Sequence, residues 1–137
     1  MAVLVSDELL KRVIAFHGHL GPFLVLGLKA GLVANSLLGE DCFKTTAIVT
    51  TDTNPPSSCL LDGVQFVTGY TTGKGNIKLR RSKNTSILFL KEGKKLKLRL
   101  KENVLDSIRN VASEEDSQKL ALELLRKPPS ELFKVEE

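Results

Sequence analysis

Two histidines, His17 and His19, stand one residue apart where an amphipathic segment gives way to glycine and proline, and the sequence holds no others. Imidazole is the commonest metal-binding side chain and the one that titrates nearest physiological pH. On a helix the two rings would lie about 200° apart, so they face the same way only if the backbone between them is extended. Gly18 gives the backbone that freedom. A lone histidine at a helix end is usually a cap or a core residue, but this pair predicts a site between two helices.

A third metal ligand is needed, because a catalytic zinc has about three protein ligands and a structural zinc about four. Cys59 is the natural candidate, since it is a soft donor that follows a loop and opens an expected helix. If it lies at a helix N-terminus, the dipole lowers the pKa of its thiol and favours the thiolate. The alternative is a small buried apolar residue, the role that we expect for Cys42. The sequence thus predicts a divalent metal such as zinc on His17, His19 and Cys59.

The stretch 69–76 combines three glycines with Lys74. It is not a nucleotide-binding phosphate loop, because its glycines are one residue too close and Gly75 stands where Ser or Thr should follow the lysine. Such a loop can still offer backbone N–H groups and an ammonium to an anion. The alternative interpretation is a tight turn leading into a strand at Ile77.

Basic residues gather in the second half of the chain. The net charge is +4, yet eleven Lys or Arg and one acid, Glu92, lie between Lys74 and Lys101. This excess favours an anionic partner, although Lys and Arg alternating with Leu are also typical of the solvent face of an edge strand. Aromatic residues make up only 5% of the chain and no RNA-binding motif is present, so nucleic acid is a poor candidate partner.

The length of 137 residues suits a single domain, 1–137, with a core that needs no disulfides. Two cysteines fit a reducing compartment. The N-terminus does not resemble a signal peptide, and the longest apolar run, 20–28, is far shorter than the roughly 20 residues of a membrane span. We therefore expect a cytoplasmic protein without a membrane segment.

Hydrophobic periodicity predicts the elements that must position these residues. A helix is expected over 7–16 with Ser6 as its N-cap, and a second from Pro22 to Gly39 whose small residues favour tight packing against a neighbour. The other expected elements are a strand over 45–51, a helix over 59–67, strands near 77–80, 87–90 and 96–100, a helix over 104–111 capped by Asn103, and a last helix opened by the capping box of Ser113 and Asp116 and ending near Arg126. Because helices and strands are segregated, the expected fold class is α+β: N-terminal helices packed on a mainly antiparallel β-sheet, then C-terminal helices.

Three motifs in this order resemble those of the FmdE family, which takes its name from a component of formylmethanofuran dehydrogenase. They read Phe16-His17-Gly18-His19-Leu20-Gly21-Pro22, Cys59-Leu60-Leu61-Asp62-Gly63-Val64-Gln65 and Thr68-Gly69-Tyr70-Thr71-Thr72-Gly73-Lys74-Gly75-Asn76. Their order and spacing make the resemblance specific. It implies an α+β core over about 7–100, followed here by a helical extension over 103–127. It further implies a polar cleft, a bound divalent metal and a homodimer.

The resemblance also implies roles for individual residues. It makes Asp62 a base or a group that orients a ligand, and Lys74 the cation that neutralises an anionic substrate. Carried over in full, it gives His17, His19 and Cys59 as metal ligands, Cys59, Asp62 and Lys74 as catalytic residues, and Gln65, Thr68, Thr71, Gly73 and Asn76 as contacts to a cofactor or substrate.

The chain departs from the family pattern at three places. The family usually has Cys where this chain has Gly21, commonly has Cys where it has Tyr70, and often continues into a cysteine-rich zinc finger that the residues after Leu132 do not resemble. Two fewer thiols make the site less suited to a soft or redox-active metal.

Two functions from different classes remain open. The first is a small metal-assisted enzyme acting on a small anionic ligand or one-carbon substrate. The second is a non-catalytic accessory protein whose cleft binds a cofactor or partner and whose basic strands dock a larger dehydrogenase. A third, anion or nucleic-acid binding by the basic strands alone, would show steep salt dependence.

Overall fold

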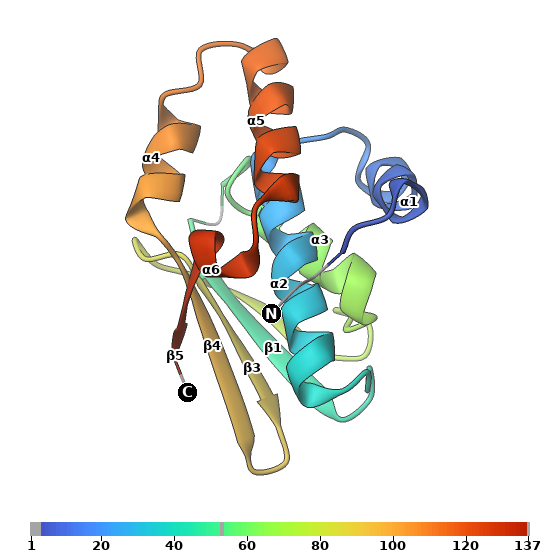
Figure 1. The fold of residues 1–137 in the computed structure, drawn as a ribbon. Coiled ribbons are helices and arrows are strands. Elements are labelled where there is room, and N and C mark those ends of the chain that lie inside the picture. The colour runs from blue at the N-terminus through green and yellow to red at the C-terminus, as the bar shows by residue number, and fades with distance from the viewer. Residues whose placement is uncertain (1–3, 53, 137) are drawn as a thin grey trace.

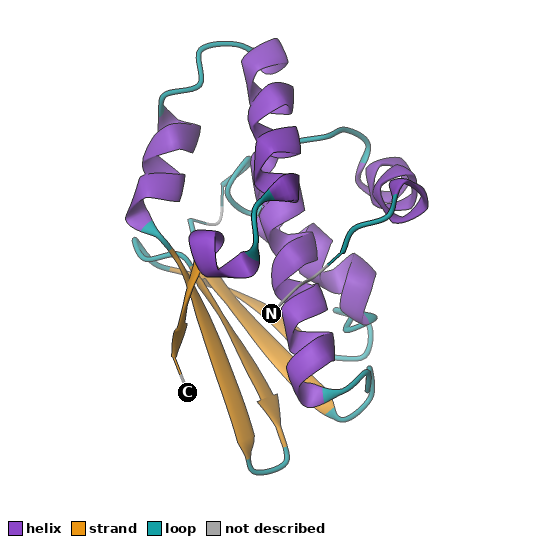
Figure 2. Cartoon of the chain, viewed as in Figure 1, coloured by secondary structure: helices purple, strands orange, loops and turns teal. Residues whose placement is uncertain are grey.

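The computed structural model describes residues 4–52 and 54–136, and in these ranges helices lie against a five-stranded β-sheet (Figures 1 and 2). Helices α2 and α3 cover one face of the sheet, while α4 and α5 stand beyond the edge at which β1 and β4 end. The elements are α1 (Asp7–His17), α2 (Pro22–Leu38), β1 (Thr45–Thr51), α3 (Cys59–Thr68), β2 (Ile77–Arg81), β3 (Ser86–Lys91), β4 (Lys94–Leu100), α4 (Glu102–Arg109), α5 (Glu114–Arg126), α6 (Pro129–Leu132) and β5 (Phe133–Glu136).

The sheet has the strand order β2-β1-β3-β4-β5. Strands β1, β3, β4 and β5 pair antiparallel in succession, which confirms the expected α+β class with a mainly antiparallel sheet. Strand β2 instead pairs parallel to β1, with Thr51 opposite Arg81 at the carboxyl ends of both strands. Helix α3 connects these two strands. The molecule therefore contains one β-α-β crossover, which we did not predict from the sequence.

Side-chain caps mark the start of two helices, α1 and α5. The Ser6 side chain accepts a hydrogen bond from the Leu9 N–H and that of Ser113 accepts one from the Asp116 N–H, both at 3.1 Å, as predicted. The expected cap at Asn103 is wrong, because α4 begins at Glu102 and its N-cap is Lys101, whose side chain makes no capping hydrogen bond.

Tertiary contacts override the local signal at this helix. The Lys101 N–H donates to the Leu132 carbonyl at 3.0 Å, and Val104 and Leu105 are buried directly after β4. The helix must begin early to bring those two side chains into the core. It also ends earlier than expected, at Arg109.

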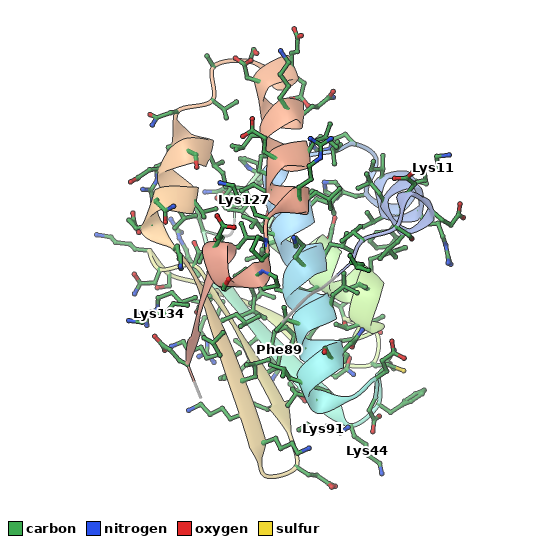
Figure 3. All side chains as sticks on the ribbon, viewed as in Figure 1. Lys11, Lys44, Phe89, Lys91, Lys127 and Lys134 are labelled. Atoms are coloured by element: carbon green, nitrogen blue, oxygen red, sulfur yellow. The ribbon has the colours of Figure 1, made fainter. Side chains whose placement is uncertain are left out.

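Helix α2 is the centre of the core. Thirteen of its 17 residues are buried, which is the pattern of a helix enclosed on all sides. Its apolar side chains meet the inner face of the sheet, where Ala47, Val49, Ile87 and Phe89 are fully buried. Figure 3 shows Phe89 on the side of the sheet that faces α2, and Lys91 reaching the end of that helix, where its ammonium donates to the Leu38 carbonyl at 2.7 Å.

Helices α2 and α3 touch backbone to backbone at glycines. A Cβ on Gly27 would overlap the Leu60 carbonyl, and a Cβ on Gly63 would overlap backbone atoms of Leu24 and Leu28. The tight packing that the small residues of α2 predicted is confirmed. This contact fixes α3, which carries Cys59 and Asp62, against the start of α2, which directly follows the histidines.

Helix α5 is tied to α2 by one buried lysine. The Lys29 side chain is 1% exposed, and its ammonium donates to the carbonyl groups of Leu124, Leu125 and Lys127 at the end of α5. Burial lowers the pKa of Lys29, while the carbonyl ends of a helix favour a cation. The opposite end of α5 is thereby held near the histidines.

None of the helices in the described ranges is long and apolar enough to cross a membrane.

Candidate functional site

The two histidines lie side by side at the break between α1 and α2. Their ring centroids are 4.9 Å apart, and the ring planes make an angle of 31°. Gly18 between them has φ 111°, and its N–H donates to the Ile14 carbonyl at 2.7 Å. The rings therefore face the same way as predicted, but through a left-handed residue and not through an extended one. Gly21 and Pro22 then begin α2.

Asp62 fixes the orientation of His17. Its Oδ2 lies 2.6 Å from His17 Nδ1, and one turn further along α3 the tilted rings of Phe16 and Phe66 also join the two helices, with centroids 5.4 Å apart. The His17 side chain is 8% exposed, whereas that of Asp62 is 38% exposed. A carboxylate on Nδ1 leaves Nε2 as the lone-pair nitrogen, which is the usual arrangement of a metal-binding histidine. His17 Nε2 is buried and has no hydrogen-bond partner.

His17 lines a cavity of about 390 Å³. His19 and Cys59 share this cavity, and so does Gly21. The structure thus brings together all three expected metal ligands. The far wall of the cavity was not predicted from the sequence: it comes from the α4–α5 connection and the start of α5, namely Val111, Ala112, Ser113, Glu114 and Ser117. Only the capping box at Ser113 marks that segment in the sequence, and nothing there indicates that it folds back over the histidines.

The thiol of Cys59 is not activated by its helix. Burial raises its pKa, and the Asp62 carboxylate raises it further, contrary to the expected lowering by the helix dipole. The reason is local. The N–H groups of Cys59, Leu60 and Leu61 already donate to carbonyls of the preceding turn, so they are not free to stabilise a thiolate. Cys42 packs against the core, as expected.

The glycine-rich loop lies at the other end of α3, and its polar groups brace the loop itself. Thr68 is nine positions after Cys59, which is a rise of about 14 Å along a helix. Lys74 Nζ donates to the Gly69 carbonyl at 2.5 Å and lies 5.3 Å from the centre of the Phe43 ring. The Asn76 Oδ1 accepts a hydrogen bond from the Thr71 N–H at 2.9 Å, and its Nδ2 donates to the Cys42 carbonyl at 2.6 Å.

The other residues that the resemblance assigned to cofactor contacts also lie around this loop. The Thr68 hydroxyl donates to the Val64 carbonyl at 2.6 Å, and Gln65 Oε1 accepts from the Thr72 N–H at 3.4 Å. Gly73 lies in the turn between Thr72 and Lys74. None of them lines the histidine cavity. The histidine cavity and the glycine-rich loop therefore lie at opposite ends of α3, and the loop forms a turn that leads into β2.

The two positions at which the family has cysteine differ in their surroundings. A Cβ on Gly21 would lie 3.5 Å from His19 Nε2, inside the cavity. Tyr70 is fully buried in the core, with its ring 6.3 Å from that of Phe89, and does not line the cavity. Burial raises the pKa of Tyr70, and the nearby Thr45 hydroxyl opposes that shift. The hydroxyl groups of Tyr70 and Thr45 are both buried without a well-formed hydrogen bond. Only the first departure removes a thiol from the histidine site.

The fold and the spacing of the motifs agree with a family match. A model of the family described as "FmdE, Molybdenum formylmethanofuran dehydrogenase operon" matches residues 16–134, which include every element from α2 to α6. The chain belongs to the FmdE family. The match extends through α4 and α5, so the segment that covers the histidine cavity is part of the family region.

Part of the chain is also similar to a much longer protein. This relative is a "Probable S-adenosyl-L-methionine-binding protein" of Archaeoglobus fulgidus, 35% identical over 89 residues. The alignment covers 64% of this chain and 22% of the relative. The matched segment therefore spans about a fifth of that protein's length.

Proposed function

We propose that this FmdE protein binds a divalent metal ion, zinc being the best match to its donors, and uses it to act on a small anionic substrate. The observation that carries the proposal is the buried, unpartnered Nε2 of His17, held by Asp62 at a cavity shared with His19 and Cys59. Two imidazoles and a thiol are a donor set that zinc accepts in open, catalytic sites. The free thiols also support a cytoplasmic location.

The donors fit zinc in kind but are not yet gathered around one point. In the ranges 4–52 and 54–136, no three His, Cys, Asp or Glu side chains converge closely enough to hold a metal as they stand. Metal binding therefore has to draw the three donors closer together. The raised pKa of Cys59 means that metal binding must also displace the thiol proton.

Several residues in and beside the cavity have a task in this proposal. Asp62 accepts a hydrogen bond from the Nδ1–H group of His17, so that Nε2 presents its lone pair. The hydroxyl groups of Ser113 and Ser117 lie on the opposite wall, where they can donate hydrogen bonds to a bound substrate. When bound, zinc supplies Lewis acidity and lowers the pKa of a coordinated water. Phe23 and Ile108 give the cavity an apolar part.

Zinc titration of the metal-free protein tests the proposal. We expect about one zinc per chain in the wild type, and an affinity weaker by about 10- to 100-fold in Asp62→Asn, which removes only the charge that orients His17. His19→Ala and Cys59→Ser should lose more, while Cys42→Ser, a thiol outside the cavity, should bind like the wild type. Absence of binding in the wild type, or an equal loss in Cys42→Ser, would contradict the site.

A second candidate function, docking of a partner protein, is favoured by the uncovered face of the sheet. Ile48, Leu88 and Leu90 alternate with core-facing residues, and register places Ile48 opposite Leu88. Because side chains alternate between the two faces of a strand, these three residues lie on the face away from α2, where they form an aliphatic strip. Basic residues border the strip: Lys78 and Arg80 on β2, Lys95, Lys97 and Arg99 on β4, and Lys134 on β5, with Glu136 as the acid between them.

This surface fits an acidic protein partner better than a second copy of the chain, because two such faces would place like charges together. Aliphatic side chains also offer nothing for nucleic-acid bases to stack on.

Zero-length cross-linking should join Lys78 or Lys95 to Asp or Glu of one defined partner. Lys78→Glu with Arg80→Glu should abolish those cross-links, whereas Lys11→Glu with Arg12→Glu on α1 should not. Loss of the cross-links in both double variants, or in His19→Ala, would contradict this docking mode. The homodimer implied by the resemblance remains a prediction.

A further inference from the structure

A second cavity, of about 750 Å³, adjoins the histidine cavity. The two share Phe23, Pro56 and Ile108 as lining residues. Its volume lies within the usual range for small-molecule sites, roughly 300 to 1,000 Å³. The two cavities together offer a continuous surface for a ligand that is too large for the histidine cavity alone.

The position of this cavity follows from the parallel pair of strands. Thr51 and Arg81 are the last residues of β1 and β2 and lie opposite each other in the sheet, and both line the cavity. The loop from β1 into α3 contributes Asp52, Pro56 and Ser57. In sheets with parallel strands, ligands bind beyond the carboxyl ends of the strands, where the connections to the helices diverge. The one β-α-β unit of this fold places its carboxyl edge at this cavity.

The lining combines cations, hydroxyls and an apolar wall. Arg81 and Lys83 form no ion pair in the described part of the chain, whereas Arg109 is already bound to Glu102 at 3.0 Å and Asp106 at 2.9 Å. The hydroxyl-bearing residues at the cavity are Thr51, Ser57, Ser82 and Thr85, and the apolar ones include Phe23, Leu105 and Ile108.

One carboxylate, Asp52, also faces the cavity. Its Oδ1 accepts the Asn54 N–H at 3.0 Å, so it is engaged in its own turn. The two unpaired cations therefore outnumber the acid. Cations with several hydroxyls suit a group that has three acceptor oxygens and up to two negative charges, which is a phosphate. The residues that border the histidine cavity are apolar and suit the body of the ligand.

We propose that this cavity binds the phosphate group of a small molecule whose apolar body lies across Phe23 and Ile108 and extends toward His17 and His19. The inference rests on the proposed function for the end that reaches the histidines. It replaces Lys74, which lies at the other end of α3, as the source of positive charge for an anionic substrate. Arg81 and Lys83 take that role.

Amide NMR of the metal-free protein, titrated with phenyl phosphate and with inorganic phosphate, tests this proposal. Phenyl phosphate should shift the amides of Thr51 and Ser82 at the phosphate end and of Ile108 at the ring end. It should also bind about tenfold more tightly than inorganic phosphate, because the ring covers the apolar wall. Arg81→Gln with Lys83→Gln should weaken binding by about tenfold or more.

The matched control is Lys94→Gln with Lys95→Gln, which removes the same charge from the start of β4. It should leave the affinity for phenyl phosphate unchanged, and an equal loss there would show diffuse attraction and overturn the site. Shifts that stop at Thr51 and Ser82 would overturn the shared ligand and leave an adventitious ion only.

Zinc titration of the wild type and of Arg81→Gln with Lys83→Gln separates this proposal from the proposed function. Zinc binding without phenyl phosphate binding in the wild type refutes the phosphate site alone. Phenyl phosphate binding without zinc binding refutes the metal site and, with it, the link to the histidines.

Discussion

Gly63→Ala is expected to lower the free energy of unfolding by about 3 kcal/mol or more, the largest effect of any single methyl group that we predict for this chain. The added Cβ would overlap backbone atoms of Leu24, Gly27 and Leu28, and backbone cannot rotate away as a flexible side chain can. Helices α2 and α3 would have to separate along their main contact. Chemical denaturation measures the change.

Gly73→Ala is the matched control. Gly73 has no positive φ, and the nearest atom to an added Cβ there is 4.0 Å away, so stability should change by less than about 0.5 kcal/mol. Similar stability of Gly63→Ala and Gly73→Ala would mean that the two helices do not pack as closely as the structure has them.

Gly63→Ala should also weaken zinc binding, because α3 places Asp62 beside His17. Any separation of the helices lengthens the contact between Asp62 Oδ2 and His17 Nδ1, which is 2.6 Å in the structure. Packing at Gly27 and Gly63 is thus part of the proposed site, although neither glycine lies in the cavity. Stability and metal affinity are expected to fall together in Gly63→Ala, and both should be retained in Gly73→Ala.

Local patterns in the sequence were sufficient for most of the elements. The caps at Ser6 and Ser113, the alternation of Leu and Lys in β4 and the stop at Gly39 depend on neighbouring residues only, and each predicted its element correctly. The start of α4 was predicted wrongly because burial of Val104 outweighs the capping preference of Asn103. Strand β5 was missed because its four residues form a strand only by pairing with β4.

The candidate site was predictable only where its residues are close in sequence. The His17–Gly18–His19 pair could be found from residue types alone, and the placement of Cys59 in the same cavity needed only that both lie at helix ends. The division between the histidine cavity and the glycine-rich loop could not be found in this way, since it depends on α3 keeping Cys59 and Thr68 at opposite ends. The wall from α5 depends on its tertiary contact with Lys29 of α2, and the place of Arg81 and Lys83 depends on the parallel pairing of β2.

Gly21 is the position at which an added donor atom should most change the proposed metal affinity. It has an extended backbone, φ −147°, which any residue adopts, and a Cβ there would lie 3.5 Å from His19 Nε2. A cysteine at this position would add a thiol to His17, His19 and Cys59 without moving the backbone. The wild-type chain, which has no converged set of three ligands in the described ranges, should by comparison bind zinc weakly and exchange it readily.

Gly21→Cys is accordingly expected to raise the affinity for zinc by about 100-fold over the wild type. Gly21→Ser, which has nearly the same shape but lacks the soft donor, should raise it little. Loading with cobalt provides a second readout, because each thiolate ligand adds sulfur-to-metal charge-transfer absorption, and the variant should show more of it than the wild type. If both variants bind zinc as the wild type does, position 21 does not face the metal, and the place of the site between His19 and the start of α2 must be abandoned. If Gly21→Cys alone gains affinity, the family's usual cysteine and this chain's glycine represent a tight and a labile form of one metal site.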